Sequence, residues 1–330
     1  MSSRRRLLIA AGASVLAAPH VLFAQQPPKI WRIGFLAARS RPASIDTDVI
    51  GAFTRGMLEL GYIDGKNIVY EWRFADGKYE RLPGLAADLV KLKLDLIVAA
   101  TTPPAQAARQ ATRTIPIVMA SVGDPVRSGL VESLARPGGN ITGVTNFTGD
   151  TSKKQLDMLV ATLPKLSRVA VLINTDSEVN EANYKSIQAA AQVIGVRTFP
   201  VPARMPGEFD LAFSVMARER AQALLVLANS VFYERRSQIA DLAAKARLPA
   251  IYAQAQHAEA GGLMSYGSDA TDGYRRAAYY VDRILKGAKP SDLPVEQPTK
   301  IDFVINLRAA KALGITIPQH VLQRADRVIE

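Results

Sequence analysis

The sequence predicts an α/β protein with two similar halves, each built on a parallel sheet that helices cover. Three observations predict this fold class. Short apolar runs alternate with amphipathic, helix-forming segments, and a polar loop follows each apolar run. The alternation then begins again after the turn-forming residues 136–140. Because ligands in such sheets bind beyond the carboxyl ends of the strands, these polar loops are the candidate site.

The first half contains a regular series of expected strands and helices. Apolar residues at helical spacing over residues 49–60, followed by Gly61, predict a helix that ends at that glycine. Residues 67–73 alternate between apolar and polar side chains, which is typical of a strand. Further strands are expected at residues 30–36, 95–99 and 115–120, and further helices at residues 79–92 and 105–111. Strands that are separated by helices in this way run parallel.

The second half repeats the pattern after a short run at residues 142–146, which we expect to cross between the halves. Helices are expected at residues 153–163, 180–194, 208–220 and 231–246, and strands at residues 168–173, 198–201, 223–228 and 250–253. The loops at the carboxyl ends of the strands are residues 37–46, 100–104, 121–125, 174–180, 229–232 and 254–257.

One of these loops joins the apolar strand at residues 95–99 to a helix. Thr101 and Thr102 stand at the N-cap positions of that helix, and Pro103 suits its first turn. A helix start offers unpaired N–H groups and a partial positive charge, so the loop predicts a site for a carboxylate or another anion. In the alternative interpretation, the two threonines only cap their helix.

The first 24 residues have the pattern of a targeting segment. Three arginines, at residues 4–6, precede an apolar run over residues 7–18, and Ala24 offers a cleavage point before Gln25. The arginines also resemble a loose twin-arginine signal, so both the Sec and the twin-arginine route remain open. An uncleaved anchor is the alternative, but Pro19 and His20 interrupt a run that is too short to span a bilayer. We therefore expect an exported, soluble chain.

The composition excludes several kinds of partner. The chain of 330 residues has no cysteine, so it forms neither a disulfide nor a cysteine-ligated metal site. Its net charge of +11 includes the three arginines at residues 4–6, and the other basic residues are dispersed. Dispersed basic residues do not form a nucleic-acid footprint, so we expect no nucleic-acid partner.

The sequence lacks the motifs of the common enzyme classes. It has no G-x-x-x-x-G-K-[ST] loop, so ATP must be hydrolysed by another subunit, and no G-x-S-x-G elbow. His257 and His320 lie far apart without a ligand-like spacing. We therefore expect no catalytic residue, no metal ligand and no cofactor.

Several long strings of the chain match one family. They are GDPV at residues 123–126, ARPGGN at 135–140, AEAGGLMSYG at 258–267 and LPVEQPTK at 293–300. On these strings, residues 31–330 closely resemble the ABC transporter substrate-binding family of the tryptophan/tyrosine type.

The resemblance implies a type I periplasmic-binding fold, in which two Rossmann-like lobes with parallel sheets are joined by three crossovers. It divides the chain into lobe 1, residues 29–146 and 268–293, and lobe 2, residues 147–267 and 294–330. Closure of the two lobes about a trapped ligand is the mechanism that this fold allows.

The loops that would meet a ligand depart from the family pattern. Thr101-Thr102-Pro103-Pro104 stands where members often have Gly-Thr-Pro-Ala, and residues 174–178 replace a loop that usually begins Asn-Pro. Asn229-Ser230 stands where an Asp-Pro pair is common. An amino-acid ligand needs a carboxylate partner for its ammonium, so the missing acid at position 229 weakens the assignment of an aromatic amino acid as the ligand.

Position at strand ends selects the candidate ligand-binding residues, which are Thr101, Thr102, Asp124, Asn146, Thr175, Ser177, Asn180, Asn229, Ser230, Gln254 and Tyr266. Each has a plainer interpretation. Asp124 can form an Asp-Pro turn, Asn146 can belong only to the crossover, and the residues at 175–180 and 229–230 can cap the helices that follow them. Phe232 or Tyr252 can stack on a ligand ring or belong to the core.

The sequence thus predicts a periplasmic protein that captures a small polar or aromatic solute, with amino acids and other carboxylates as candidates. It would act as a monomer and deliver the solute to an inner-membrane ABC permease with a separate ATPase. The alternative is a sensing module that presents its closed form to a membrane sensor.

Overall fold

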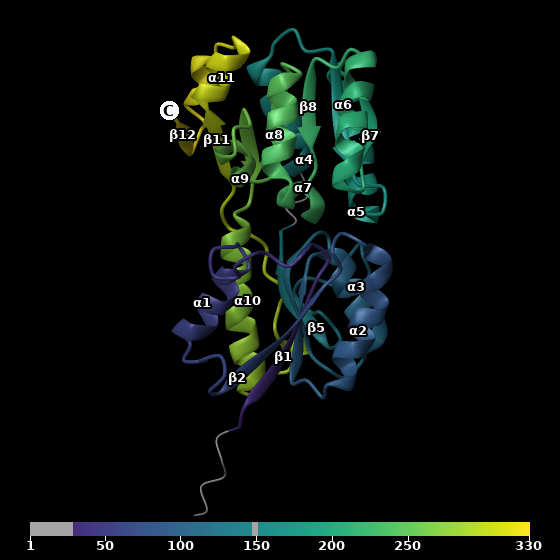
Figure 1. The fold of residues 1–330 in the computed structure, drawn as a ribbon, viewed down its shortest axis with the longest axis vertical. Coiled ribbons are helices and arrows are strands. Elements are labelled where there is room, and N and C mark those ends of the chain that lie inside the picture. The colour runs from purple at the N-terminus through teal and green to yellow at the C-terminus, as the bar shows by residue number, and fades with distance from the viewer. Residues whose placement is uncertain (1–28, 147–150) are drawn as a thin grey trace, which may run out of the picture.

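The computed structural model describes residues 29–146 and 151–330, which form two lobes stacked along the longest axis of the molecule (Figure 1). Each lobe is built on one sheet. The predicted targeting segment, residues 1–24, lies outside the described residues, as does the predicted start of lobe 2 at residue 147.

The sheet of the first lobe has five parallel strands in the order β2-β1-β3-β4-β5. They are β1 (Trp31–Ala37), β2 (Ile68–Phe74), β3 (Leu96–Ala100), β4 (Ile117–Val122) and β5 (Ile141–Thr145). Every residue of β3 and β4 is buried. Both faces of these central strands are covered, which is why they read as nearly continuous apolar runs.

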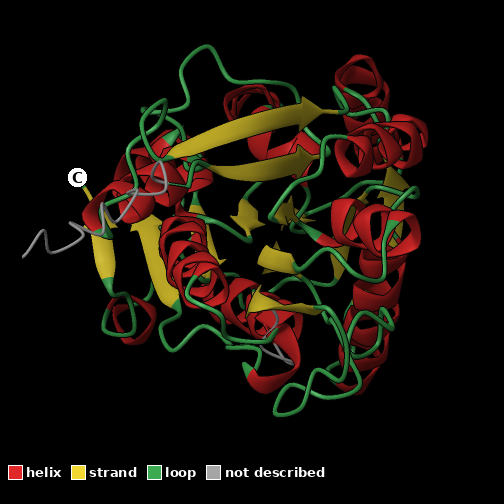
Figure 2. Ribbon diagram, turned by 90° about the horizontal axis from the view of Figure 1, so that it is seen from below, coloured by secondary structure: helices red, strands yellow, loops and turns green. Residues whose placement is uncertain are grey.

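Helices pack on both faces of this sheet. The core on one face includes residues of α2 (Leu82–Lys91) and α3 (Thr102–Ala111), whereas α1 (Gly51–Glu59) and α10 (Ala270–Leu285) pack against each other on the opposite face. Figure 1 shows α10 beside α1, although the two helices are far apart in the sequence. Figure 2, a view from below, shows helices on the outside of the molecule and strands between them.

The sheet of the second lobe has seven strands in the order β12-β11-β10-β9-β8-β6-β7. They are β6 (Arg168–Ile173), β7 (Arg197–Pro202), β8 (Ala223–Val226), β9 (Ala250–Tyr252), β10 (Met264–Gly267), β11 (Asp302–Asn306) and β12 (Arg327–Ile329). Only the pairing of β10 with β11 is antiparallel within this described sheet. Since β12 pairs parallel with β11, these two strands run opposite to the other five, and antiparallel strands at the edge of a parallel sheet are common in large α/β sheets.

The second lobe contains more helices than its periodicity predicted. They are α4 (Thr151–Thr162), α5 (Glu178–Val193), α6 (Phe209–Arg218), α7 (Ser230–Glu234), α8 (Arg236–Lys245), α9 (Ala255–Glu259), α11 (Leu307–Leu313) and α12 (Gln319–Leu322), with a 3-10 turn at Pro206–Glu208. The single helix expected at residues 231–246 is two helices, because Arg235 leaves the helical region with φ −101° and ψ 24°. The helix expected at residues 79–92 begins with a 3-10 turn, Tyr79–Arg81, before α2.

The chain passes between the lobes three times. It leaves the first sheet after β5, returns after β10 to form α10, and leaves again after the 3-10 turn at Pro290–Asp292 to form β11. Two of these passages lie side by side, since Val144 and Glu296 form a parallel bridge. The structure therefore confirms a two-lobed α/β fold with three crossovers, whereas the exact lobe boundaries stay a prediction.

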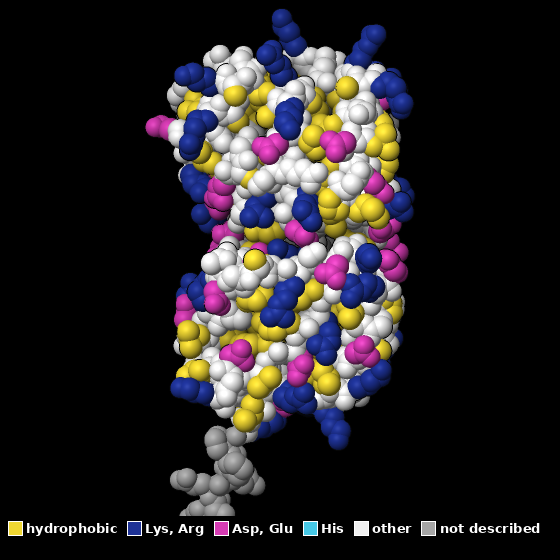
Figure 3. Space-filling view, viewed as in Figure 1, with side chains coloured by type: hydrophobic (Ala, Val, Ile, Leu, Met, Phe, Trp, Pro, Cys, Tyr) yellow, Lys and Arg dark blue, Asp and Glu magenta, His cyan; other side chains and the backbone are white. Residues whose placement is uncertain are grey.

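The surface carries charges of both signs. Figure 3 shows basic and acidic side chains mixed over both lobes on the visible face. Within residues 29–146 and 151–330, no helix is long and apolar enough to cross a membrane.

Candidate ligand-binding cleft

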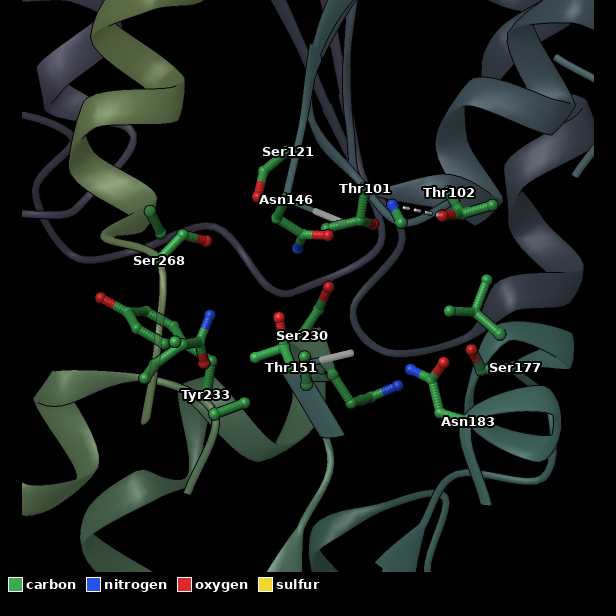
Figure 4. Close-up of a pocket in the computed structure, with 18 of the residues that line it drawn as sticks. Thr101, Thr102, Ser121, Asn146, Thr151, Ser177, Asn183, Ser230, Tyr233 and Ser268 are labelled. Atoms are coloured by element: carbon green, nitrogen blue, oxygen red, sulfur yellow. Dashed lines mark hydrogen bonds between the residues drawn. The ribbon is translucent and has the colours of Figure 1, made fainter. Parts of the chain in front are cut away.

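A cavity lies between the lobes, and its walls are loops that follow strands of both sheets. Strand-end residues of the first lobe that line it are Arg39, Thr101, Gly123 and Asn146, and those of the second lobe are Ser177, Asn229, Gln254 and Ser268. In Figure 4, Ser121, Asn146 and Thr101 face Thr151, Ser177 and Asn183 across the gap. The carboxyl ends of both sets of parallel strands thus meet at one place, as expected for a doubly wound fold.

Thr101 has an unusual backbone on the first-lobe wall. Its φ of 82° and ψ of 172° place it in a region that is almost exclusive to glycine. This is the position at which the family pattern often has glycine, so the threonine side chain is accommodated at a conformational cost. Its Oγ1 is buried and has no hydrogen-bond partner.

The expectation that the two threonines cap α3 is wrong in its detail. Neither hydroxyl makes a capping bond to the helix. The Oγ1 of Thr102 instead accepts a hydrogen bond from the N–H of Gly123 at 3.0 Å, which ties the loop after β4 to the start of α3 (Figure 4). Pro103 and Pro104 carry no N–H, so the first turn of α3 offers fewer donors to an anion than a typical helix start. A bound anion must therefore depend more on nearby side chains.

Arg39 supplies a buried cation to the same wall. It is 8% exposed, and its guanidinium pairs with the carboxylate of Asp48 at 2.9 Å. The same Asp48 oxygen accepts from the N–H of Ile50 at 3.1 Å, which fixes the carboxylate and hence the guanidinium. The Nε of Arg39 has no partner. The guanidinium also lies 5.7 Å from the ring centroid of Tyr233 in the second lobe.

The second-lobe wall is held by helix caps. Ser177 Oγ accepts from the N–H of Asn180 at 3.4 Å and caps α5, and Asn229 Oδ1 accepts from the N–H of Val231 at 2.9 Å and caps α7. The capping interpretation of these two residues therefore holds, although both also line the cavity. Their polar groups are largely satisfied within the protein.

Two glutamines bring unpaired acceptors to the second-lobe wall. Gln155, on α4, is 1% exposed, and its Nε2 donates to the carbonyl oxygen of Tyr266 at 2.8 Å. That bond fixes the amide, so that its Oε1 is left buried without a partner. Gln254 stands at the N-cap of α9 but makes no side-chain capping bond, and its Oε1 is likewise buried and unpaired.

Three tyrosines, Tyr79, Tyr233 and Tyr274, line the cavity as well. Burial raises the pKa of each phenol above its ordinary value. All three therefore stay neutral and offer hydroxyl groups and ring faces to a ligand.

Comparison with known proteins identifies the family. The model of the family described as ABC transporter substrate binding protein matches residues 40–329. This chain belongs to that family. The tyrosine-binding protein of Clostridioides difficile (strain R20291) is 28% identical over 264 residues, which is 80% of this chain and 75% of that protein. The family expected from the sequence is therefore confirmed.

Two solved relatives differ in how well this substrate-binding protein superposes on them. The ABC domain from Streptococcus pneumonia in complex with L-Trp is 27% identical, with a TM-score of 0.82 over 91% of this chain and 100% of that chain. A ligand-free, open substrate-binding protein with adhesive properties from Clostridium difficile is 25% identical, with a TM-score of 0.63 over 91% of this chain and 99% of that chain. Since identity and coverage are similar, the lobes here are arranged more like those of the ligand-bound relative. More distant solute-binding structures share the same type I fold.

Hydrogen bonds between the lobes hold this arrangement at one side of the cleft. The Nδ2 of Asn229 donates to Tyr79 Oη at 3.1 Å, and the backbone N–H of Ser40 donates to Glu234 Oε2 at 3.2 Å. Asn229 thus caps a helix of the second lobe and also binds a side chain of the first.

Four of the residues selected from the sequence lie outside the lining of this cavity. Asp124 Oδ1 accepts from the N–H of Arg127 at 2.9 Å within its own turn. Thr175 is an exposed residue of the loop that follows β6. Asn180 is buried, with its Oδ1 accepting from Asn174 N–H at 3.0 Å and its Nδ2 donating to the Ala228 carbonyl at 2.9 Å. The ring of Tyr266 packs against Phe303, which belongs to a hydrophobic core of the second lobe.

The other selected residues, Thr101, Thr102, Asn146, Ser177, Asn229, Ser230 and Gln254, line the cavity. Phe232 and Tyr252, considered as ring-stacking candidates, are fully buried in a hydrophobic core of the second lobe instead. Sequence reasoning missed Arg39, Gln155 and Tyr274, which also line it. Arg39 falls within the loop selected at residues 37–46, but Gln155 and Tyr274 lie on helices and had no strand-end signal.

Proposed function

We propose that the mature chain captures a small polar or aromatic solute between its lobes and delivers it to an ABC permease. The ATPase would be a separate subunit, and the chain itself would catalyse no reaction and act as a monomer. Membership of the substrate-binding family and an interlobe cavity lined by strand-end loops support this proposal.

A set of unpaired polar atoms carries the proposal. Five buried side-chain atoms without a hydrogen-bond partner belong to residues that line the cavity, namely Arg39 Nε, Thr101 Oγ1, Thr151 Oγ1, Gln155 Oε1 and Gln254 Oε1. Each buried polar group without a partner costs about 1–3 kcal/mol. A polar ligand between the lobes would supply hydrogen-bond partners for these atoms, and its binding would favour the closed arrangement of the lobes.

Export would precede binding. We propose that residues 1–24 direct the chain by the Sec or the twin-arginine route to the periplasm, with cleavage after Ala24. The three basic residues, the apolar run and the small residue at the cleavage point support this proposal.

The test uses the mature protein, beginning at Gln25, purified without refolding. Native mass spectrometry should show a trapped compound of small mass, and thermal shift with a library of amino acids, organic acids and sugars should raise the melting temperature for one class. A protein that retains no compound and responds to no solute would contradict the proposal. To test the cleavage point, the protein is purified from the periplasm and its N-terminal residues are sequenced.

Delivery needs a separate assay. The loaded protein should stimulate ATP hydrolysis by its permease complex reconstituted in vesicles, whereas the protein without ligand should not. Stimulation of a membrane sensor in place of a permease would favour the sensing alternative.

A further inference from the structure

The unpaired atoms of the cavity differ between the two lobes. On the first-lobe wall they are the Nε of Arg39, which is a donor, and the hydroxyl of Thr101. On the second-lobe wall they include the amide oxygens of Gln155 and Gln254, which are acceptors. A ligand that forms hydrogen bonds with the unpaired atoms of both walls therefore has an acceptor at one end and a donor at the other.

On the first-lobe wall, the donors of Arg39 and Thr101 are best satisfied by an anionic group of the ligand. Arg39 is fixed by its bond to Asp48, and its free Nε–H leaves one donor of the guanidinium for a ligand. Guanidinium and hydroxyl donors are the usual partners of a carboxylate. The two prolines at the start of α3 remove backbone donors there, so these side chains carry more of the recognition.

On the second-lobe wall, the donor group of the ligand would form hydrogen bonds with uncharged acceptors. The Gln155 amide cannot turn over without losing its bond to the Tyr266 carbonyl, so the group that it presents to the cavity is an amide oxygen. Among the described residues that line the cavity, the charged ones are Arg39 and Lys153. A neutral amide suits a hydroxyl group, whereas a buried ammonium requires an opposite charge.

We propose that this cleft is selective for carboxylates whose second polar group is an uncharged donor, as in a 2-hydroxy acid, over the corresponding α-amino acids. The proposal rests on the proposed function, since it names the class of solute that the same cleft takes. The ring faces of Tyr79, Tyr233 and Tyr274 favour an aromatic side chain on that acid.

Matched pairs of compounds test this selectivity directly. The pairs are L-tyrosine with 3-(4-hydroxyphenyl)lactate, L-tryptophan with indole-3-lactate, and L-phenylalanine with phenyllactate, so that each pair differs only in ammonium against hydroxyl. Titration calorimetry with the mature protein should show the hydroxy acid binding roughly tenfold or more tightly in at least one pair, about the effect of one unpaired polar group.

The outcomes separate the two proposals. An amino acid that binds as tightly as its hydroxy acid, or more tightly, overturns the selectivity and leaves solute capture standing. A different solute class that binds while all hydroxy acids fail does the same. Failure of every solute, with no compound trapped after purification, removes solute capture itself.

A charge variant tests the acceptor side. Gln254→Glu keeps the size of the side chain and places a negative charge at the start of α9, where the partial positive charge of the helix favours it. This variant should gain roughly tenfold in affinity for the amino acid relative to the hydroxy acid, because the ammonium then meets a charge. Gln256→Glu is the matched control, since Gln256 lies on the same helix but does not line the cavity.

A second charge variant covers the case in which Gln254→Glu does not fold. Asn183→Asp places a carboxylate on the same second-lobe wall, from α5, and its melting temperature reports its folding. Relative affinities that are unchanged in both folded variants would overturn the proposal that missing charge is what disfavours the ammonium.

Discussion

The two walls of the cleft are built from equivalent strand ends but are stabilised differently. On the second-lobe wall, Ser177 and Asn229 satisfy helix starts, so local bonds hold the loops in place. On the first-lobe wall, Thr101 has a strained backbone and an unpaired hydroxyl, and Arg39 has an unpaired Nε. The first wall therefore offers its unpaired donors from a strained loop, whereas the second wall offers its unpaired acceptors, Gln155 and Gln254, beside loops that their own helix caps hold in place.

The largest effect is expected at Arg39. Arg39→Met should lower the free energy of unfolding by about 3 kcal/mol, because the carboxylate of Asp48, whose side chain is 12% exposed, loses its partner. Affinity for a carboxylate ligand should fall by roughly tenfold or more, since a donor of the first wall is lost. Urea unfolding and titration calorimetry measure the two effects.

The double variant Arg39→Met with Asp48→Asn separates them. It removes the unpaired charge, so most of the stability should return while the affinity stays low. If affinity returned together with stability, Arg39 would be a structural residue of the first wall and not part of its recognition surface.

The next effect is a pH dependence of stability that we expect in the second lobe and not in the first. His257 is 2% exposed in the second lobe, and burial lowers its pKa to about 4. Residues 29–146 of the first lobe contain no histidine. Between pH 6.5 and about 4, only the unfolded chain binds the proton, so the free energy of unfolding should fall as pH decreases through this window.

The loss should be on the order of 3 kcal/mol, and hydrogen exchange should show it in the second lobe before the first. His257→Phe is the control, because it keeps a ring against Tyr252, whose ring lies 4.9 Å away, and removes the titration. A pH slope that is the same in this variant would assign the acid sensitivity to other groups.

Thr101 should show opposite effects on stability and binding. Thr101→Gly should raise the free energy of unfolding by about 1 kcal/mol, because the relief of strain exceeds the added freedom of the unfolded chain. Affinity should fall roughly fivefold with the loss of the hydroxyl. Thermal unfolding of the ligand-free protein and calorimetry give the two values, and Thr101→Ser should retain the affinity. A glycine variant that binds as tightly as the parent would show that the strain serves no recognition.

The smallest effect is expected at the contact between the walls. Tyr79→Phe removes the bond from Asn229 and should weaken closure by about 0.5 kcal/mol, so affinity falls about twofold. Asn229→Ala removes the same bond and also the cap of α7, and should cost about 1 kcal/mol more in stability. Equal stabilities of the two variants would show that the cap of α7 contributes little.

The strands that were easiest to predict are those covered on both faces. β3 and β4 read as apolar runs because every one of their residues is buried. The elements after β9 were harder, since α9, α11 and α12 span only a few residues each and show little periodicity. The break between α7 and α8 follows from the backbone of Arg235, for which the sequence offers no glycine or proline signal.

The sequence by itself determined the alternation of strands and helices, the polar loops at the strand ends and the family, because these depend on neighbouring residues and on strings in order. The tertiary structure decided which loop residues meet a ligand. Asp124 and Asn180 bond within their own lobes, whereas Gln155 and Tyr274 reach the cavity from helices. Such choices depend on how two distant segments pack, and a side chain is left unpaired at the cleft only when no partner from elsewhere in the chain reaches it.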